Sequence, residues 1–357
     1  PPIIMSETQT ASQNNMQRMR ALGADWWNDS CDINELSEAV SMGAVGATSN
    51  PVIVAAVVKG DSERWIPVLQ DLINDNPSDS EEDIAWKLIE RVGMDASKLL
   101  LPVYEETKGV KGHLCLQVNP KYYRNADRML QHGIELASLA PNIAIKAPAT
   151  KAGLDAVEGM TAAGVRVNVT VSFSVAQAIA AEEAIDRGLQ QAADPDSIHP
   201  YITIMVGRVD DQLKRTYAAG GIDADKDALE WAGVAVFKHA AEIFRDRGYK
   251  GTLLAAAYRN QIQWSEIIGP DVLQSIPYGW WKKYNEADID PQLSLNEPMD
   301  STIMSELMKF DDFKQAYNED GMTHEEFVRY GASINTIKQF IEGYEGLLKD
   351  IRGLMLV

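Results

Sequence analysis

Residues 142–150 read NIAIKAPAT, a short apolar run that contains one charged side chain, Lys146. Three apolar residues precede this lysine, as in a buried strand, and a Pro-Ala-Thr corner follows it and opens a helical pattern. A lysine at the carboxyl end of a buried strand is costly to desolvate unless its pKa falls or it finds a partner. Desolvated lysines attack carbonyl carbons and form Schiff bases, whereas most lysines keep the ammonium group in water. The stretch alone fits either a nucleophile or a solvated strand end.

The order of a short apolar strand followed by an amphipathic helix repeats along the whole chain. The predicted strands span residues 24–29, 43–50, 112–118, 142–147, 166–172, 201–206, 252–257 and 272–276. The predicted helices include residues 83–106, 123–139, 151–163, 175–193 and 223–247. Eight such units predict an α/β fold, a (β/α)8 TIM barrel with additional helices. The alternative is an open doubly wound sheet, but the G-x-G-x-x-G loop typical of that fold is absent from the sequence.

The domain organisation follows from these units. We expect a single domain over residues 1–357, with the barrel at about 24–277 and a helical C-terminal extension at about 300–357. Residues 310–356 carry apolar side chains at helical spacing, and such a tail typically packs over a barrel mouth or against its outer wall. Residues 280–299 are rich in Pro, Asn and Asp, which predicts a loop.

Composition limits the classes of partner and cofactor. The formal net charge of −19 over 357 residues argues against nucleic acid and anionic membranes, although it allows a local basic pocket for a small anion. The two cysteines, Cys31 and Cys115, argue against a disulfide framework and a zinc site. The sequence shows neither a signal-peptide pattern nor a run approaching the roughly 18 apolar residues of a membrane span. We therefore expect a cytoplasmic protein without a metal or another cofactor.

Polar side chains mark the ends of the predicted strands. In a barrel the carboxyl ends of the strands meet at one face, where catalytic residues collect. The side chains placed there are Asp29, Asn50, Gln117, Lys146, Asn168, Thr170, Thr203, Arg208 and Arg259. Asp29 and Asn50 fit equally well as helix N-caps, the latter before a proline. Asn168 and Thr170 are two residues apart and share one strand face, so they either form an internal hydrogen-bonded layer or contact a ligand.

Arg208 and Arg259 follow the sixth and seventh predicted strands. Many barrels bind phosphate in this region, and a guanidinium group can give paired hydrogen bonds to phosphate oxygens. The alternative is a pair of surface salt bridges, which an acidic chain readily supplies. A lysine, two arginines and a cluster of Asp, Asn and Thr residues together indicate a class I aldolase-type site.

Several ordered motifs resemble those of the transaldolase family over about residues 25–277. They are WNDS at 27–30, GAVGATSNP at 43–51, IKAPAT at 145–150, VNVTVSFS at 167–174, VGRVD at 206–210 and RN at 259–260. The resemblance implies an enzyme of the pentose phosphate pathway. It would transfer a dihydroxyacetone unit from sedoheptulose 7-phosphate or fructose 6-phosphate to an aldose phosphate, without a metal.

The resemblance also implies roles for individual residues. Lys146 would form the Schiff base, and Asp29 would handle the proton of the hydroxyl at the bond being cleaved. Thr170 would position the catalytic water. Gln117 would occupy a further catalytic position, at the end of the third strand. The remaining residues would bind substrate: donor hydroxyls at Asn50 and Asn168, phosphate at Arg208 and Arg259, and the sugar beside Thr203.

The sequence departs from the transaldolase pattern at four positions. Gln117 stands where typical transaldolases have glutamate, and glutamine cannot carry a proton as a carboxylic acid does. The related fructose-6-phosphate aldolases, which release free dihydroxyacetone, also have glutamine there. Thr203, Met205 and Ala257 replace a serine, an aromatic residue and a small hydroxyl residue. An aldolase, an enzyme for a modified sugar and a non-catalytic sugar-phosphate-binding relative therefore remain alternatives, and the choice between monomer and homo-oligomer stays open.

Overall fold

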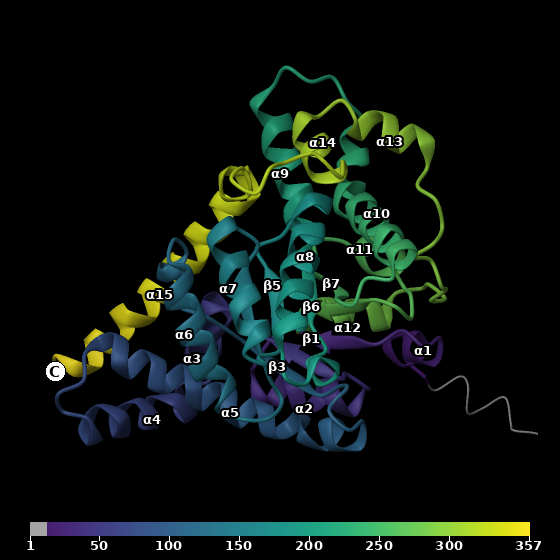
Figure 1. Ribbon diagram of the computed structural model, residues 1–357. Helices are drawn as coiled ribbons and strands as arrows, with labels where there is room; N and C mark the ends of the chain where they lie inside the picture. Colours follow the sequence, from purple (N-terminus) through teal and green to yellow (C-terminus); the bar gives the residue numbers. More distant parts are fainter. Residues whose placement is uncertain (1–12) are drawn as a thin grey trace, which may run out of the picture.

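The chain forms a closed barrel of eight parallel strands in the order β1 to β8, as seen in a computed structural model that describes residues 13–357 (Figure 1). The strands are β1 Trp26–Asn28, β2 Gly46–Thr48, β3 His113–Gln117, β4 Ile143–Pro148, β5 Val167–Thr170, β6 Tyr201–Met205, β7 Thr252–Ala256 and β8 Leu273–Ile276. Each of the eight predicted strands is present. The fold is therefore the predicted (β/α)8 barrel.

Helices surround this barrel and extend beyond it. Those in the first half of the chain are α1 Asn15–Ala21, α2 Ile33–Ser41, α3 Pro51–Gly60, α4 Ser62–Asp75, α5 Glu81–Glu106, α6 Ala126–Ala137 and α7 Lys151–Ala162. Those in the second half are α8 Val175–Gln191, α9 Val206–Ala219, α10 Ala232–Arg247, α11 Ile262–Ser265, α12 Tyr278–Glu286, α13 Ser301–Leu307, α14 Asp311–Tyr317 and α15 Gly331–Met355. Short 3-10 turns are η1 Pro120–Tyr122, η2 Pro195–Ser197, η3 Lys226–Trp231 and η4 Phe327–Arg329. No helix within residues 13–357 is long and apolar enough to cross a membrane.

Two predicted segments were wrong in detail. Residues 223–247 do not form one helix, because Lys226–Trp231 is the 3-10 turn η3 and α10 begins only at Ala232. Residues 280–299 are not all loop, since α12 covers Tyr278–Glu286. Trp281 and Tyr284 on α12 are buried three residues apart, and their burial stabilises this helix despite the polar residues that follow.

The register of the barrel strands places three candidate residues at one level. Lys146 on β4 pairs with Gln117 on β3 and with Asn168 on β5. Directly paired residues of neighbouring parallel strands point to the same side of a sheet. The three side chains therefore form one continuous polar layer across β3, β4 and β5.

The C-terminal helix α15, yellow in Figure 1, is a single element of 25 residues. It packs against α3, α5 and α9 through the buried side chains of Ile337, Phe340 and Tyr344. Phe340 also reaches the cavity at the carboxyl ends of the strands. The predicted helical tail therefore forms part of the barrel mouth.

Candidate active site

A cavity of about 260 Å³ lies at the carboxyl ends of the strands. Seven of the nine candidate residues line it: Asp29, Asn50, Lys146, Thr170, Thr203, Arg208 and Arg259. Asn168 lies in the polar layer of the barrel interior, and Gln117 lines a neighbouring cavity of about 20 Å³. The structure thus brings candidate residues from the carboxyl ends of six strands, β1, β2, β4, β5, β6 and β7, to one place.

Lys146 is buried in this cavity with 6% of its surface exposed. Its Nζ donates a hydrogen bond to the carbonyl oxygen of Ser49 at 3.1 Å, and no carboxylate within residues 13–357 lies at ion-pair distance. Burial lowers the pKa of Lys146, Arg208 lowers it further, and the negative charge of Asp29 opposes both. A lowered pKa increases the fraction of neutral amine near neutral pH, which is the form that attacks a carbonyl carbon.

Asp29 follows β1 and faces the same cavity. It does not cap α2, because Asp32 holds that position and accepts the hydrogen bond from the Glu35 amide. Asp29 instead accepts a hydrogen bond from Ser275 Oγ at 3.0 Å. Burial raises its pKa above the usual range of aspartate, while Lys146 and Ser275 act in the opposite direction. A carboxyl group with a raised pKa suits proton transfer.

Exchanging Asp29 for asparagine should shift the titration of Lys146 to lower pH. The carboxylate raises the pKa of Lys146, so its removal leaves burial and Arg208 less opposed. The readout is the pH dependence of Lys146 acetylation by a small anhydride, followed by peptide mass spectrometry without substrate. Asp25→Asn is the control, because Asp25 pairs with Lys111 away from the candidate cavity. An unchanged or higher midpoint in Asp29→Asn would show that the two groups are not electrostatically linked.

Asn168 and Thr203 form a hydrogen-bonded layer inside the barrel. Thr203 Oγ1 donates to Asn168 Oδ1 at 2.8 Å, and Asn168 Nδ2 donates to Cys115 Sγ at 3.5 Å. Both the oxygen and the nitrogen of the Asn168 side-chain amide therefore have hydrogen-bond partners within the protein. This is the internal hydrogen-bonded layer that the sequence offered as the alternative to a ligand contact. Thr203 still lines the cavity, so one hydroxyl connects the layer with the space above it.

Thr170 and Gln117 lie on either side of β4 and carry unpaired oxygens. Thr170 Oγ1 and Gln117 Oε1 are buried and have no hydrogen-bond partner in the described part of the chain. Val171, directly after Thr170, has φ of +50°, a strained conformation for a β-branched residue. Buried polar atoms without partners indicate a place for water or a ligand. Gln117 is paired with Lys146 in register, and Thr170 lines the same cavity as Lys146. The side-chain oxygens of both residues are therefore available to accept hydrogen bonds near Lys146.

Arg208 and Arg259 line one side of the cavity. Arg208 Nη1 donates to Gln339 Oε1 at 2.7 Å, and its Nε is buried without a partner among residues 13–357. Burial and the neighbouring charge of Arg259 lower the pKa of Arg208 to about 10, so it stays charged at neutral pH. Arg259 instead pairs with Asp211 at 3.2 Å, which is the salt bridge expected as the alternative. The two guanidinium groups nevertheless share one cavity wall and suit an anion.

Asn50 combines two roles that the sequence left open. Its side chain accepts a hydrogen bond from the Ile53 amide at 2.8 Å and caps α3, which begins at Pro51. It also lines the cavity. Capping fixes the side chain in place, so a ligand would meet an amide of defined orientation.

Several residues at or beside the site were not among the candidates. Trp280, Gln339 and Phe340 line the cavity, and Ser275 binds Asp29. Phe340 belongs to the apolar pattern of the C-terminal helix, which predicts packing only. Gln339 gave no local signal, because its position depends on how α15 docks.

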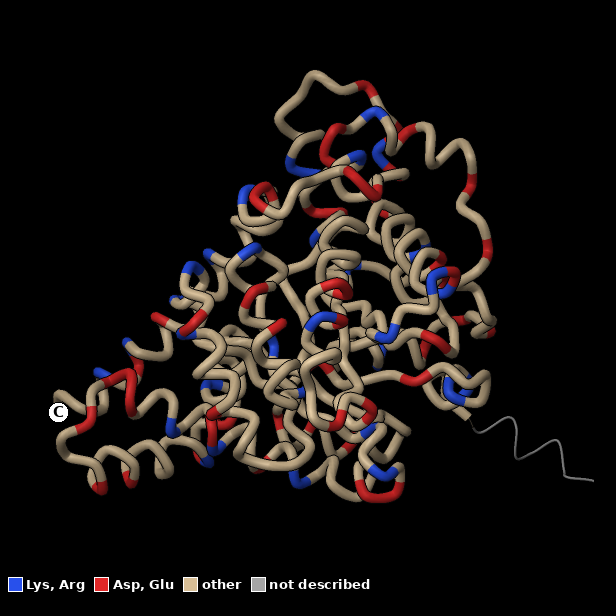
Figure 2. The backbone as a smooth tube through the Cα atoms, in the orientation of Figure 1, with Lys and Arg blue, Asp and Glu red and all other residues tan. Residues whose placement is uncertain are grey.

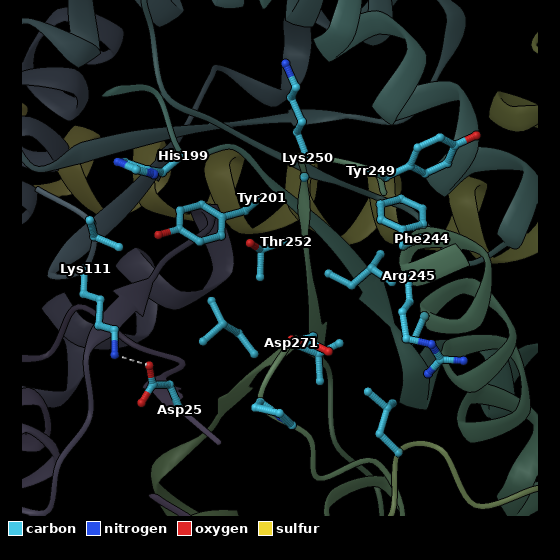
Figure 3. A pocket seen from close by; sticks show the side chains of 18 of the residues that line it. Asp25, Lys111, His199, Tyr201, Phe244, Arg245, Tyr249, Lys250, Thr252 and Asp271 are labelled. Atoms are coloured by element: carbon cyan, nitrogen blue, oxygen red, sulfur yellow. Dashed lines mark ion pairs between the residues drawn. The ribbon is translucent and has the colours of Figure 1, made fainter. Parts of the chain in front are cut away.

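A larger cavity of about 590 Å³ lies at the opposite end of the barrel, where the strands begin (Figure 3). Its lining includes the paired charges of Lys111 and Asp25, 2.7 Å apart, together with His199 and Tyr201. None of the nine candidate residues lines it.

Among residues 13–357, no group of three His, Cys, Asp or Glu side chains could hold a metal ion. Basic and acidic residues are interspersed over the outer helices in Figure 2, so the net negative charge does not form one separate region.

The sequence as a whole is similar to known proteins. The family model described as Transaldolase/Fructose-6-phosphate aldolase matches residues 26–351. The chain is 28% identical over 306 residues to "Transaldolase 1" of Streptomyces avermitilis, covering 76% of this chain and 80% of that protein. It is 26% identical over 345 residues to "Transaldolase" of Kocuria rhizophila, covering 87% and 88% of the two chains. It is 34% identical over 222 residues to "Transaldolase" of Thermobifida fusca, covering 56% and 57%.

Proposed function

The chain belongs to the transaldolase/fructose-6-phosphate aldolase family, and on that premise we propose that it is a transaldolase-type enzyme acting through Lys146. Its substrates are sugar phosphates, and the unit transferred is dihydroxyacetone. The observation that carries the proposal is the buried Lys146 without an ionic partner, in one cavity with Asp29 and two arginines. We place this activity in the cytoplasm, which the two free, buried cysteines support.

In the proposed reaction the neutral amine of Lys146 attacks the C2 carbonyl of a ketose phosphate and water leaves, giving a protonated imine. Asp29 accepts the proton of the C4 hydroxyl, the C3–C4 bond breaks, and its electron pair moves toward the imine nitrogen. An aldose phosphate departs, and an enamine stays on Lys146. The enamine carbon then attacks the aldehyde carbon of a second aldose phosphate, and Asp29 returns its proton to the aldehyde oxygen, which becomes the new C4 hydroxyl. Hydrolysis of the new imine releases the product ketose and regenerates the amine.

The other residues of the cavity orient the substrate in this proposal. Arg208 and Arg259 bind the phosphate through charge-assisted hydrogen bonds. The donor hydroxyls face Asn50 and Thr203, which line the cavity. They also face Asn168, which is hydrogen-bonded to Thr203 in the layer below. Thr170 and Gln117 hold the water that hydrolyses the imine, which would satisfy their unpaired oxygens. The test is formation of sedoheptulose 7-phosphate from fructose 6-phosphate that depends on erythrose 4-phosphate.

The second candidate function is simple aldol cleavage, and Gln117 favours it. The amide beside Lys146 cannot donate and recover a proton in the catalytic cycle as a carboxylic acid can. Such an enzyme would release free dihydroxyacetone from fructose 6-phosphate without an acceptor. The dependence of turnover on erythrose 4-phosphate separates the two candidates.

Replacing Gln117 with glutamate should raise the ratio of transfer to cleavage. A carboxyl group here restores a proton carrier next to the imine and the water that hydrolyses it. The ratio is measured as sedoheptulose 7-phosphate formed against dihydroxyacetone released from the same fructose 6-phosphate. Gln131→Glu on the exposed surface of α6 is the charge-matched control. If Gln117→Glu left the ratio at its original value, this position would not control the outcome.

A further inference from the structure

Gln339 on the C-terminal helix contacts Arg208 on α9 across 131 residues of sequence. Its Oε1 accepts a hydrogen bond from Arg208 Nη1 at 2.7 Å, and the same side chain lines the candidate cavity. The contact joins an element outside the eight strand–helix units to one of the two arginines at the cavity wall. The C-terminal helix is therefore part of the anion-binding region rather than only a cover.

The partners of the two arginines differ in charge. Arg259 lies 3.2 Å from the carboxylate of Asp211, which partly neutralises it. Arg208 has a neutral amide as its side-chain partner and no ion pair within residues 13–357. A neutral acceptor fixes the guanidinium plane and leaves the positive charge available to another ligand. The buried, unpartnered Nε of Arg208 adds a free donor at the same position.

The docking of α15 holds Gln339 in place. A Cβ atom on Gly331, at the start of the helix, would lie 2.4 Å from Gln212 Oε1 on α9, so these two helices approach closely there. Two turns later Phe340 is 1% exposed and lines both the main cavity and the small cavity of Gln117. Gln339 therefore lies between the close approach at Gly331 and the buried ring of Phe340. The docking of α15 at these two points fixes the position of the Gln339 backbone.

We propose that Gln339 is a positioning residue for the phosphate end of the substrate: it orients Arg208 while leaving its charge for the phosphate oxygens. The identity of the ligand as a sugar phosphate rests on the proposed function. The role of Gln339 in holding a charged arginine over the cavity rests on geometry alone. The C-terminal helix thereby contributes to selectivity for phosphorylated over unphosphorylated substrates.

The test compares three substitutions by their affinity for fructose 6-phosphate, measured by titration calorimetry in a Lys146→Met background that prevents turnover. Gln339→Glu should weaken binding by about tenfold or more, because an ion pair with Arg208 removes a charge-assisted contact to phosphate. Gln339→Ala should weaken it by about threefold, since Arg208 keeps its charge but loses one neutral hydrogen bond. Asn335→Asp adds the same charge one turn earlier, away from Arg208, and should leave binding unchanged.

A second readout separates this inference from the proposed chemistry. Borohydride trapping of dihydroxyacetone on Lys146 involves no phosphate, so Gln339→Glu should trap it as efficiently as the unmodified protein. The unmodified protein could fail to trap dihydroxyacetone while the Gln339 variants still show the expected order of affinities for fructose 6-phosphate. That result would overturn the proposed chemistry and leave Gln339 as a positioning residue. Equal affinity of Gln339→Glu and its parent for fructose 6-phosphate, or no binding by the parent, would overturn the inference.

Discussion

Lys146→Ala is expected to abolish turnover, with kcat falling by at least about four orders of magnitude, as for other enzymes that lose a covalent nucleophile. No other lysine within residues 13–357 lines the cavity, so no neighbouring amine there can replace it. Serine and threonine hydroxyls nearby cannot form an imine. The measurement is the acceptor-dependent rate with fructose 6-phosphate and erythrose 4-phosphate.

The fold should survive this substitution. Lys146 gives one hydrogen bond, to the Ser49 carbonyl oxygen, and its removal also relieves the desolvation of an amine without a carboxylate partner. Lys146→Met keeps more of the side-chain volume and provides a second inactive variant. Lys151→Ala, five residues later at the exposed start of α7, should remain fully active. An active and correctly folded Lys146→Ala protein would contradict the mechanism.

Replacing Arg208 or Arg259 with alanine should raise KM for the sugar phosphate by about an order of magnitude or more, since a charged clamp on phosphate contributes a few kcal/mol. We expect the larger effect at Arg208, because Arg259 already shares its charge with Asp211. The kcat value should change less than KM, since neither side chain touches the bond that breaks. The measurement is steady-state kinetics with varied fructose 6-phosphate.

The control for the arginine variants is Arg215→Ala on α9, whose guanidinium binds Gln212 away from the cavity. It carries the same loss of charge and should keep the original KM. Trapping of unphosphorylated dihydroxyacetone should proceed normally in both cavity variants. Unchanged KM values for Arg208→Ala and Arg259→Ala would show that phosphate binds elsewhere.

Much of the barrel could be predicted because most strands are short apolar runs with a polar residue at or just after the end. Lys146 in NIAIKAPAT is the clearest case, and its environment in the structure is the buried one that the pattern indicates. The helix breaks were harder. The end of α9 depends on glycines at 220 and 221 with positive φ, and α12 depends on burial of Trp281, neither of which has a periodic signature.

The only site residues that could be predicted were those with a reactive or polar side chain at the end of a predicted strand. Asp29 was ambiguous because an aspartate at a strand end can also cap the helix that follows, and only the structure shows that Asp32 caps α2 instead. Gln117 lies beside Lys146 in register, yet it lines a neighbouring small cavity, to which Phe340 also contributes. Gln339 and Phe340 come from the far end of the chain, and local sequence does not encode how that helix docks.

The most direct test of the account is borohydride reduction in the presence of fructose 6-phosphate, with intact-protein and peptide mass spectrometry. We expect a reduced adduct of one dihydroxyacetone unit on Lys146, and we expect erythrose 4-phosphate to diminish it because the acceptor removes the enamine as it forms. An adduct on another lysine, or none at all under conditions where the protein binds the sugar phosphate, would contradict Schiff-base chemistry at Lys146.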